Sequence, residues 1–301
     1  MENSIISGAY DLHIHTAPDY EARKLDDVEM AQRIISSGMS GYVIKSHASS
    51  TTDRAYLVNK MFPECKAVAS ITLNQFQGGL NPLAVDIAAL LGAKIVWFPT
   101  TDSTLSFERH EADPDRRTGY SGILRQLGDR NISCFPVRIL DGNNKVLPEV
   151  RDVLDVICKH DLILGTGHLS TSEVFALVKA AREQGVRKII ITHVSSYRPG
   201  INDKQSLRDV EVQRELLKYN VYIEHCSLPV FLGRIPIEKV AAQIKEVGPD
   251  RIVLSSDLGR IKNPYPDAGF LEYCNKLLEN GISESDVRKM IVHNPAALLD
   301  L

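Results

Sequence analysis

The chain has 301 residues, of which 44% are hydrophobic and 24% charged, and its formal net charge is −3. This composition is typical of a soluble globular protein with a large core. The small net charge gives no reason to expect nucleic acid or an anionic membrane as a partner. No apolar run approaches the ~18 residues of a membrane-spanning helix. The five cysteines include no CxxC pair, and the N-terminus does not resemble a signal peptide, so we expect a cytoplasmic protein.

Short apolar runs alternate with segments of helical spacing along most of the chain. The predicted strands are Ile5–Tyr10 running into the motif at 11–16, Gly41–Lys45, Ala67–Leu73, Lys94–Pro99, Leu162–His168, Lys188–His193, Val221–His225 and Arg251–Asp257. The predicted helices are Leu25–Ser37, Thr52–Phe62, Pro82–Leu91, Tyr120–Asp129, Pro148–His160, Ser170–Glu183, Ser206–Tyr219, Ile237–Val247, Asp267–Glu279 and Glu284–Val292. Ser170 and Glu173 form the pattern of a capping box.

The alternation is interrupted at about residues 100–147. The polar stretch from Thr100 to Thr118 is too long for an ordinary connection and is a candidate lid or binding loop. Two short runs, Ile132–Ile139 and Lys145–Leu147, are joined through Asp-Gly-Asn-Asn and predict a β-hairpin. No linker marks a second domain, so we predict a single domain over residues 1–301 with this segment as an insertion.

The eight remaining strands read as continuous apolar runs, which is typical of a parallel sheet covered by helices. Eight such strand–helix units predict a (β/α)₈ (TIM) barrel of the α/β class. An open, doubly wound sheet is the main alternative. That fold favours a glycine-rich phosphate loop after the first strand, whereas here the strand leads into His15-Thr16-Ala17-Pro18.

Histidines gather at the ends of the predicted strands. His13 and His15 are two residues apart, so on a strand both side chains point to one face, where neutral imidazoles can share a divalent metal. Six of the nine histidines stand at or near strand C-termini, the rim where barrel enzymes carry their chemistry. These six are His13, His15, His47, His168, His193 and His225, and Asp257 ends the last strand. The pattern predicts a metal site at that rim.

The order of these residues resembles the metal signature of the amidohydrolase superfamily, and the resemblance extends over nearly the whole chain. The matching pieces are HxH on strand one, His168 on strand five, His193 on strand six, Asp257 on strand eight, and the Asn-Pro-Ala helix start at 294–296. The resemblance implies that His13, His15, His168, His193 and Asp257 bind metal. It further implies that Asp257 is the catalytic base, which accepts a proton from the metal-bound water. Zinc is the first expectation, and Mn, Fe or Co remain open.

The fourth strand departs from this pattern. Binuclear members of the superfamily usually carry a bridging carboxylated Lys, Glu or Cys there, but here the strand ends in Trp97-Phe98-Pro99. Lys45 on strand two is the nearest candidate, as a carboxylated ligand or as a cation that binds substrate, and a partly exposed lysine is the plain alternative. Asp102 could also substitute from the loop. One metal is therefore expected and a second is left open.

Other rim residues are candidates for substrate binding, namely His47, His225, Asn74 and Lys45. His47 could equally be a metal ligand or an ordinary rim histidine. Glu224 and His225 are neighbours, so only one faces the barrel interior, and His225 is preferred because it is closer to the strand end. Asp19 and Arg23 are more often a solvated pair than substrate ligands. Arg109, His110, Arg116 and Arg117 could bind a carboxylate or phosphate, although most such loop charges are merely solvated.

These observations predict a metal-dependent hydrolase of a small molecule, acting on an amide, lactone or phosphoester bond. The alternatives are a metal-dependent decarboxylase on the same fold and a barrel that binds metal or ligand without turnover. The expected partner is a small-molecule substrate. Homo-oligomerisation and the identity of the substrate are left open.

Overall fold

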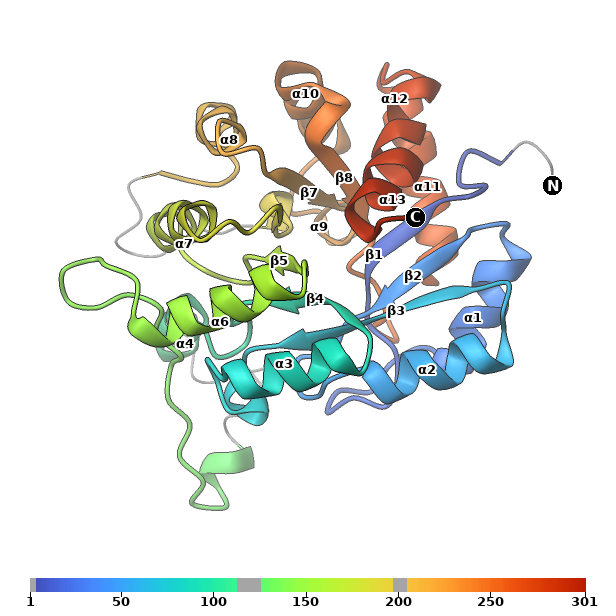
Figure 1. The fold of residues 1–301 in the computed structure, drawn as a ribbon. Coiled ribbons are helices and arrows are strands. Elements are labelled where there is room, and N and C mark those ends of the chain that lie inside the picture. The colour runs from blue at the N-terminus through green and yellow to red at the C-terminus, as the bar shows by residue number, and fades with distance from the viewer. Residues whose placement is uncertain (1–3, 113–125, 197–204) are drawn as a thin grey trace.

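A computed structural model describes residues 4–112, 126–196 and 205–301. Eight parallel strands pair in chain order within one sheet (Figure 1). They are β1 Tyr10–Ile14, β2 Gly41–Ile44, β3 Lys66–Thr72, β4 Ala93–Trp97, β5 Ile163–Gly165, β6 Lys188–Ile191, β7 Tyr222–Cys226 and β8 Ile252–Ser255. The chain just after β8 closes the sheet against β1, because the His15 amide donates to the Leu258 carbonyl at 2.9 Å and the Asp257 amide donates to the His13 carbonyl at 2.9 Å. The predicted (β/α)₈ barrel is confirmed.

Helices follow the strands and surround the barrel (Figure 1). They are α1 Asp27–Ser36, α2 Thr52–Met61, α3 Pro82–Leu90, α4 Thr104–Ala112, α6 Pro148–Lys159, α7 Thr171–Glu183, α8 Val210–Leu217, α9 Leu228–Phe231, α10 Ile237–Val247, α11 Pro266–Glu279, α12 Glu284–Arg288 and α13 Asn294–Leu299. The predicted capping box of α7 is present, since Ser170 accepts from the Glu173 amide and Glu173 accepts from the Ser170 amide. No helix within the described ranges has the length and apolarity needed to cross a bilayer.

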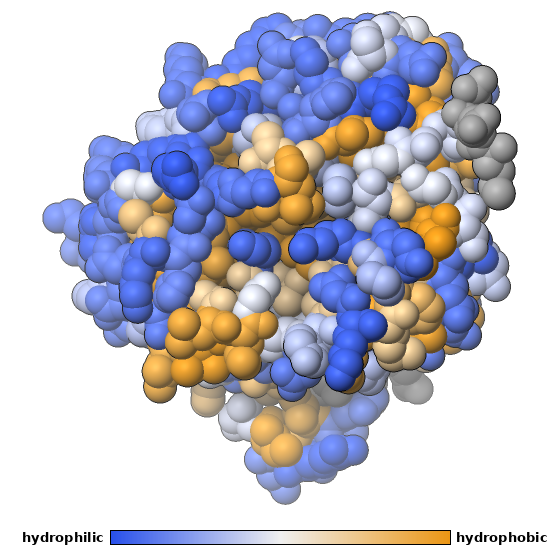
Figure 2. Space-filling model, turned by 45° about the vertical axis from the view of Figure 1, so that its right-hand side comes forward, coloured by the Kyte–Doolittle hydropathy of each residue, from blue (hydrophilic) through white to orange (hydrophobic). Residues whose placement is uncertain are grey.

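The core has two layers. One fills the barrel interior with a side chain from most strands, among them Leu12, Val43, Ile95 and Val253, and Leu298 of α13 packs against this cluster. The other lies between the outer face of the sheet and the helices. The interior is therefore a packed core, so the polar chemistry is confined to the ends of the strands. The molecular surface is mostly hydrophilic on the face that Figure 2 shows, with a few apolar clusters.

The predicted start of the first strand is wrong, and the predicted hairpin in the insertion is shorter than expected. Residues 5–8 form turns, and the first strand begins only at Tyr10. The hairpin is reduced to one isolated antiparallel bridge between Leu140 and Val146. The Asp141 carboxylate instead accepts from the backbone amides of Asn143 and Lys145, which closes a local turn. Pro136 also lacks the amide that a ladder requires.

The polar stretch after β4 contains a helix where we expected a loop. Helix α4 begins at Thr104, and the Ser103 hydroxyl accepts from the Ser106 amide at 3.2 Å, as a cap does. Arg116, Arg117 and most of the helix predicted at 120–129 lie outside the described residues.

Candidate metal centre

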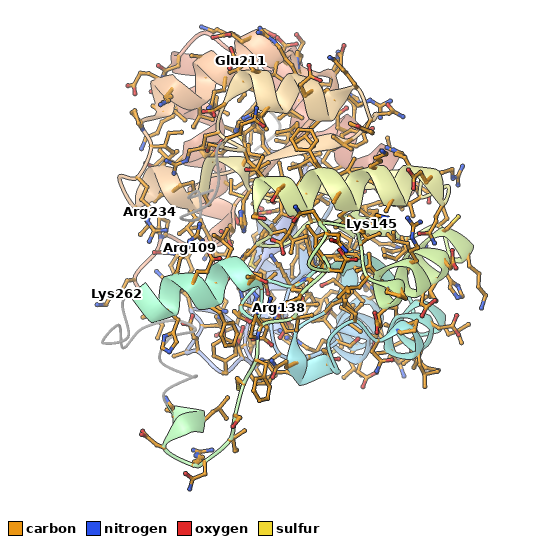
Figure 3. The ribbon with its side chains drawn as sticks, turned by 90° about the vertical axis from the view of Figure 1, so that its left-hand side faces the viewer. Arg109, Arg138, Lys145, Glu211, Arg234 and Lys262 are labelled. Atoms are coloured by element: carbon orange, nitrogen blue, oxygen red, sulfur yellow. The ribbon has the colours of Figure 1, made fainter. Side chains whose placement is uncertain are left out.

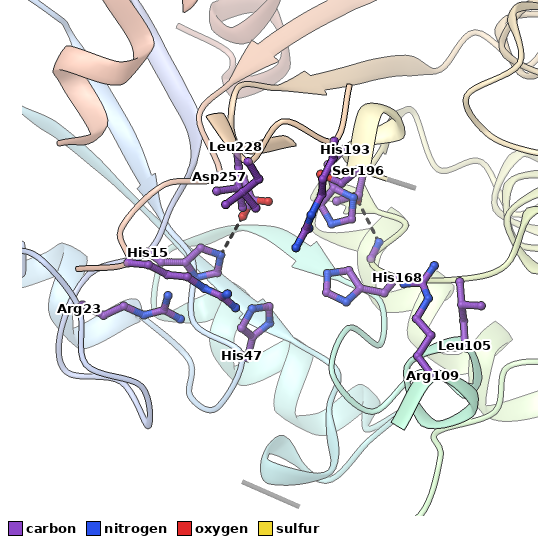
Figure 4. A pocket seen from close by; sticks show the side chains of 15 residues that line it. His15, Arg23, His47, Leu105, Arg109, His168, His193, Ser196, Leu228 and Asp257 are labelled. Atoms are coloured by element: carbon purple, nitrogen blue, oxygen red, sulfur yellow. Dashed lines mark hydrogen bonds and ion pairs between the residues drawn. The ribbon is translucent and has the colours of Figure 1, made fainter. Parts of the chain in front are cut away.

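The strand ends bring the predicted site residues to one face of the barrel. His13 lies within β1, Glu224 and His225 lie within β7, and the others follow within three residues of their strand ends. Five of the predicted residues line a cavity of about 190 Å³ (Figure 4): His15, His47, His168, His193 and Asp257. His13 lies beneath them and is fully buried.

Glu224 orients His13. Both Glu224 carboxylate oxygens lie 3.2 Å from His13 Nδ1, and Oε2 also accepts from the His193 backbone amide at 2.8 Å. Burial alone would raise the pKa of Glu224, but His13, His193 and Lys45 outweigh it and bring this pKa down to about 2. An ionised carboxylate only accepts hydrogen bonds, so His13 carries its proton on Nδ1. Its Nε2 therefore carries the lone pair and faces the barrel mouth, where Lys45 Nζ lies 2.9 Å away.

Three donor atoms converge there. Asp257 Oδ1 lies 3.2 Å from His13 Nε2 and 3.3 Å from His15 Nε2, and the three atoms lie within 4.8 Å of one another. Burial holds the pKa of His15 well below its usual value, which keeps this imidazole neutral and able to donate a lone pair. The donor set of two imidazoles and a carboxylate fits a divalent metal such as zinc. We call His13, His15, Glu224 and Asp257 the carboxylate side of the site.

Three further histidines face this group, and we call them the histidine side. His168 and His193 have ring centroids 4.9 Å apart, and His47 lies 5.8 Å from His168 and 4.8 Å from the His15 ring. Burial lowers the pKa of His47 and His168 well below the usual value, and lowers that of His193 to about 4. The rings are therefore neutral, and His193 Nδ1 is buried without a hydrogen-bond partner.

Strained or glycine-only backbone places three of these residues: His193, Asp257 and His168. His193 has a φ of 31° and Asp257 a φ of 54°, values that residues with a side chain seldom adopt. Such strained conformations survive only where surrounding interactions hold the backbone in place, and they are concentrated at functional sites. Gly167, just before His168, comes so close to β4 that a Cβ atom would lie 2.2 Å from the Phe98 carbonyl oxygen. Only glycine allows this approach.

Lys45 lies in the floor of the site and not at its edge. Its Nζ is 2.9 Å from His13 Nε2 and 4.4 Å from the Trp97 ring centroid, and the side chain is fully buried. Burial lowers the pKa of Lys45, an effect that the negative charges of Asp257 and Glu224 oppose. β4, the strand on which the family pattern would have a bridging ligand, contributes the Trp97 ring instead. The ammonium thus contacts a prospective ligand atom directly.

The preference for His225 as the inward residue of β7 is wrong. Glu224 contacts His13, whereas His225 Nδ1 lies 2.8 Å from the Ser195 hydroxyl. Burial lowers the pKa of His225 to about 4. Cys226, two residues after Glu224, lies 4.0 Å from His13 Nδ1. A period of two puts Glu224 and Cys226 on one face of β7 but does not say which face points inward, so the sequence carried no signal that singled out Glu224.

Asn74 and Asp102 brace the rim. The Asn74 amide donates to the His47 carbonyl at 2.9 Å and the Thr100 hydroxyl at 2.8 Å, and its oxygen accepts from the Thr100 amide at 2.9 Å. The Thr100 hydroxyl in turn lies 2.8 Å from His47 Nδ1. The Asp102 carboxylate accepts from the Gln75 amide at 2.5 Å. A role for Asn74 in substrate binding remains a prediction.

Arginines complete the lining of the cavity: Arg23, Arg109, Arg234 and Arg260. Of these, sequence reasoning named Arg23 and Arg109 only as rim or loop charges, and missed the other two. Arg260 follows Asp257 by three residues, which was the available signal.

Comparison with known proteins gives a family and a fold. A family model described as "Family of unknown function (DUF6282)" matches residues 8–224. No curated protein matches the chain.

Similar solved structures include an amidohydrolase from Pseudomonas aeruginosa, with a TM-score of 0.60, 11% identity and coverage of 98% of this chain and 96% of that one. A TatD homologue, YJJV, from Escherichia coli K12 has a TM-score of 0.59, 11% identity and coverage of 98% and 99%. A mutant of organophosphorus hydrolase from Deinococcus radiodurans has a TM-score of 0.57, 16% identity and coverage of 98% and 94%. At these identities the likeness shows the fold, and for the fold the resemblance to the amidohydrolase superfamily is confirmed.

Proposed function

The chain belongs to DUF6282, a family of unknown function, and we propose that it is a metal-dependent hydrolase of a small molecule. One observation carries the proposal. Three donor atoms, His13 Nε2, His15 Nε2 and Asp257 Oδ1, converge at the barrel mouth, and His15 and Asp257 line the cavity above it. A divalent metal held there by these residues would supply an activated water and would polarise the scissile bond.

The chain's own residues prepare this chemistry. Burial acts to raise the pKa of Asp257, but His13, His193 and Lys45 outweigh it and hold this pKa below its usual value. The carboxylate is therefore ionised at neutral pH and is able to accept a proton from water and return it to a leaving group. Glu224 keeps His13 Nε2 directed at the site. His168 and His193 supply further imidazoles to the same cavity.

We propose one metal, with zinc as the first choice because its preferred ligands are imidazole and carboxylate. A second metal would need a bridging group, for which Lys45 is the candidate. Metal stoichiometry and an intact-mass measurement decide this point. Two metals per chain and one added carboxyl group on Lys45 would establish a binuclear centre, whereas one metal and an unmodified lysine would exclude it.

Replacing Asp257 by Asn tests catalysis. At saturating zinc we expect a loss of about 10²- to 10⁴-fold in hydrolysis, the usual contribution of a positioned acid–base group. The probes are p-nitrophenyl acetate, p-nitrophenyl phosphate and dihydrocoumarin, with zinc-loaded protein. Asp250→Asn is the matched control, since Asp250 is exposed, lies away from the site and pairs with Lys289 at 2.7 Å.

The outcomes separate the alternatives. If the wild type binds metal but hydrolyses no ester, phosphoester, lactone or amide, hydrolysis is rejected. Carbon dioxide release from carboxylate probes would then favour the decarboxylase. Its absence would favour a barrel that binds without turnover.

A further inference from the structure

Arginines are prominent in the lining of the cavity above the metal centre. Of the described residues that line it, four are arginines and only Asp257 is a carboxylate. This local arrangement contrasts with the net charge of −3 of the whole chain.

Arg23 is a nearly buried residue of the cavity lining and not a solvated rim charge. Its side chain is only 3% exposed and that of Asp19 is fully buried. Arg23 Nε and Nη2 lie 2.9 and 2.7 Å from the same Asp19 oxygen, and Nη1 lies 3.8 Å from Glu21. These carboxylates fix the guanidinium in place. A guanidinium has five N–H donors. The contacts to Asp19 use one donor on Nε and one on Nη2, so three remain that could reach a ligand in the cavity.

Arg260 stands beside Arg23. The backbones of Arg23 and Arg260 form an isolated antiparallel bridge between the loops after β1 and β8. Arg260 Nε lies 3.5 Å from Glu21, which therefore contacts both arginines. The two guanidinium groups therefore lie near each other, around Glu21, at this side of the mouth.

Arg109 lies on the other side. It belongs to α4, which follows β4, and in an eight-stranded barrel β4 is opposite β8. Figure 4 shows Arg23 and Arg109 at opposite ends of the pocket, with His15, His47 and His168 between them. Arg234, labelled with Arg109 in Figure 3, lines the same cavity from the turn after α9.

We propose that the substrate is a small dianion with one oxyanion group at each end. Arg23 and Arg260 bind one group, Arg109 binds the other, and the bond to be cleaved lies between them, over the metal ligands. Planar guanidinium groups match carboxylate and phosphate oxygens in two-point contacts. This proposal rests on the proposed function, which makes the cavity an active site, and it adds the chemical class of the substrate.

Calorimetric titration tests it without turnover. The probes are succinate, glutarate and adipate, the monoamide and diamide of each, and phosphonoacetate, titrated into both zinc-loaded and metal-free protein. We expect the best dicarboxylate to bind about 10- to 100-fold more tightly than its monoamide, and the diamide to bind least, because each charged contact is lost in turn. Tighter binding of phosphonoacetate would identify a phosphate-bearing dianion.

Variants locate the two positions. Arg23→Met and Arg109→Met should each reduce the affinity for the dianion to about that of the monoamide and leave the diamide unaffected. Arg23→Lys keeps the buried charge next to Asp19 and serves if Arg23→Met does not fold. Arg214→Met, at an exposed arginine of α8 that lies 3.5 Å from Glu246, is the control for loss of one positive charge.

Two results would overturn the inference: equal affinity for dicarboxylate and diamide, or arginine variants that leave dianion binding unchanged. Neither depends on hydrolysis. A protein that binds dianions through Arg23 and Arg109 but never turns over would refute the proposed function alone.

Discussion

The two sides of the site are held in different ways. On the carboxylate side, side-chain contacts of 3.2 to 3.3 Å between imidazole nitrogens and carboxylate oxygens link every member to another. On the histidine side, His47, His168 and His193 contact one another through their rings, with centroids 4.9 to 5.8 Å apart. Their orientation comes from the loops, through Asn74 and Thr100 beside His47 and through Gly167 before His168.

The difference teaches that equal positions at strand ends do not imply equal roles. Donor atoms on the carboxylate side are pre-aligned at distances suited to closing on one ion. The rings opposite are neutral and less constrained, so they can adjust to a metal or a substrate. We therefore expect the carboxylate side to set metal affinity and the histidine side to tune it.

The largest effect should come from removing a ligand on each side in turn. His15→Ala should abolish metal binding, with a loss well beyond the 10- to 100-fold that removal of an outer partner causes. His168→Ala should bind metal more weakly than wild type but retain it. Elemental analysis after dialysis against graded chelator measures both. Equal losses in the two variants would show that the sides are equivalent.

A smaller effect is expected from Glu224→Gln, which tests how the carboxylate side is oriented. Glutamine is nearly isosteric, but its amide no longer enforces the Nδ1–H tautomer of His13. Metal affinity should fall about 10- to 100-fold without loss of the fold. Glu215→Gln, at an exposed residue of α8, gives the baseline. An unchanged affinity would remove Glu224 from the site.

The smallest effect concerns the rim that supports the histidine side. Burial raises the pKa of Asp102 to about 6 from 3.8, although the bond from the Gln75 amide acts to lower it. The folded state thus holds this proton more tightly than the unfolded state. The contribution of Asp102 to stability is complete below pH 3.8 and is lost as the pH rises through about 6.

Above about pH 7, the free energy of unfolding of Asp102→Asn should therefore exceed that of wild type by roughly 1 to 3 kcal/mol. The variant should unfold at a higher temperature there. Near about pH 4 the two proteins should be similar, because Asp102 is then largely protonated in the folded protein. Thermal unfolding at both pH values measures the difference. A gap that is the same at both values would mean that Asp102 does not titrate as described.

Sequence reasoning identified the barrel because eight apolar runs recur with helices between them, and most site residues because strand ends meet at one rim. It could not decide between Glu224 and His225, since the phase of β7 depends on its register with β6 and β8. Lys45 looked like a rim residue because sequence does not show how deep a strand end lies. The hairpin prediction placed the turn correctly but overestimated the strands, because pairing beside the turn is limited to the Leu140–Val146 bridge and its neighbouring hydrogen bonds.

Closure of the barrel has a consequence for any shortened form of the protein. The family match ends at Glu224, before β8 and Asp257. A chain cut at that point would retain His13, His15, His168 and His193. It would lose the strand that joins β7 to β1, and both edges would expose unpaired amides and carbonyls to other chains. Such a fragment should self-associate, so biochemical work on this protein requires residues through β8 and the helices that follow.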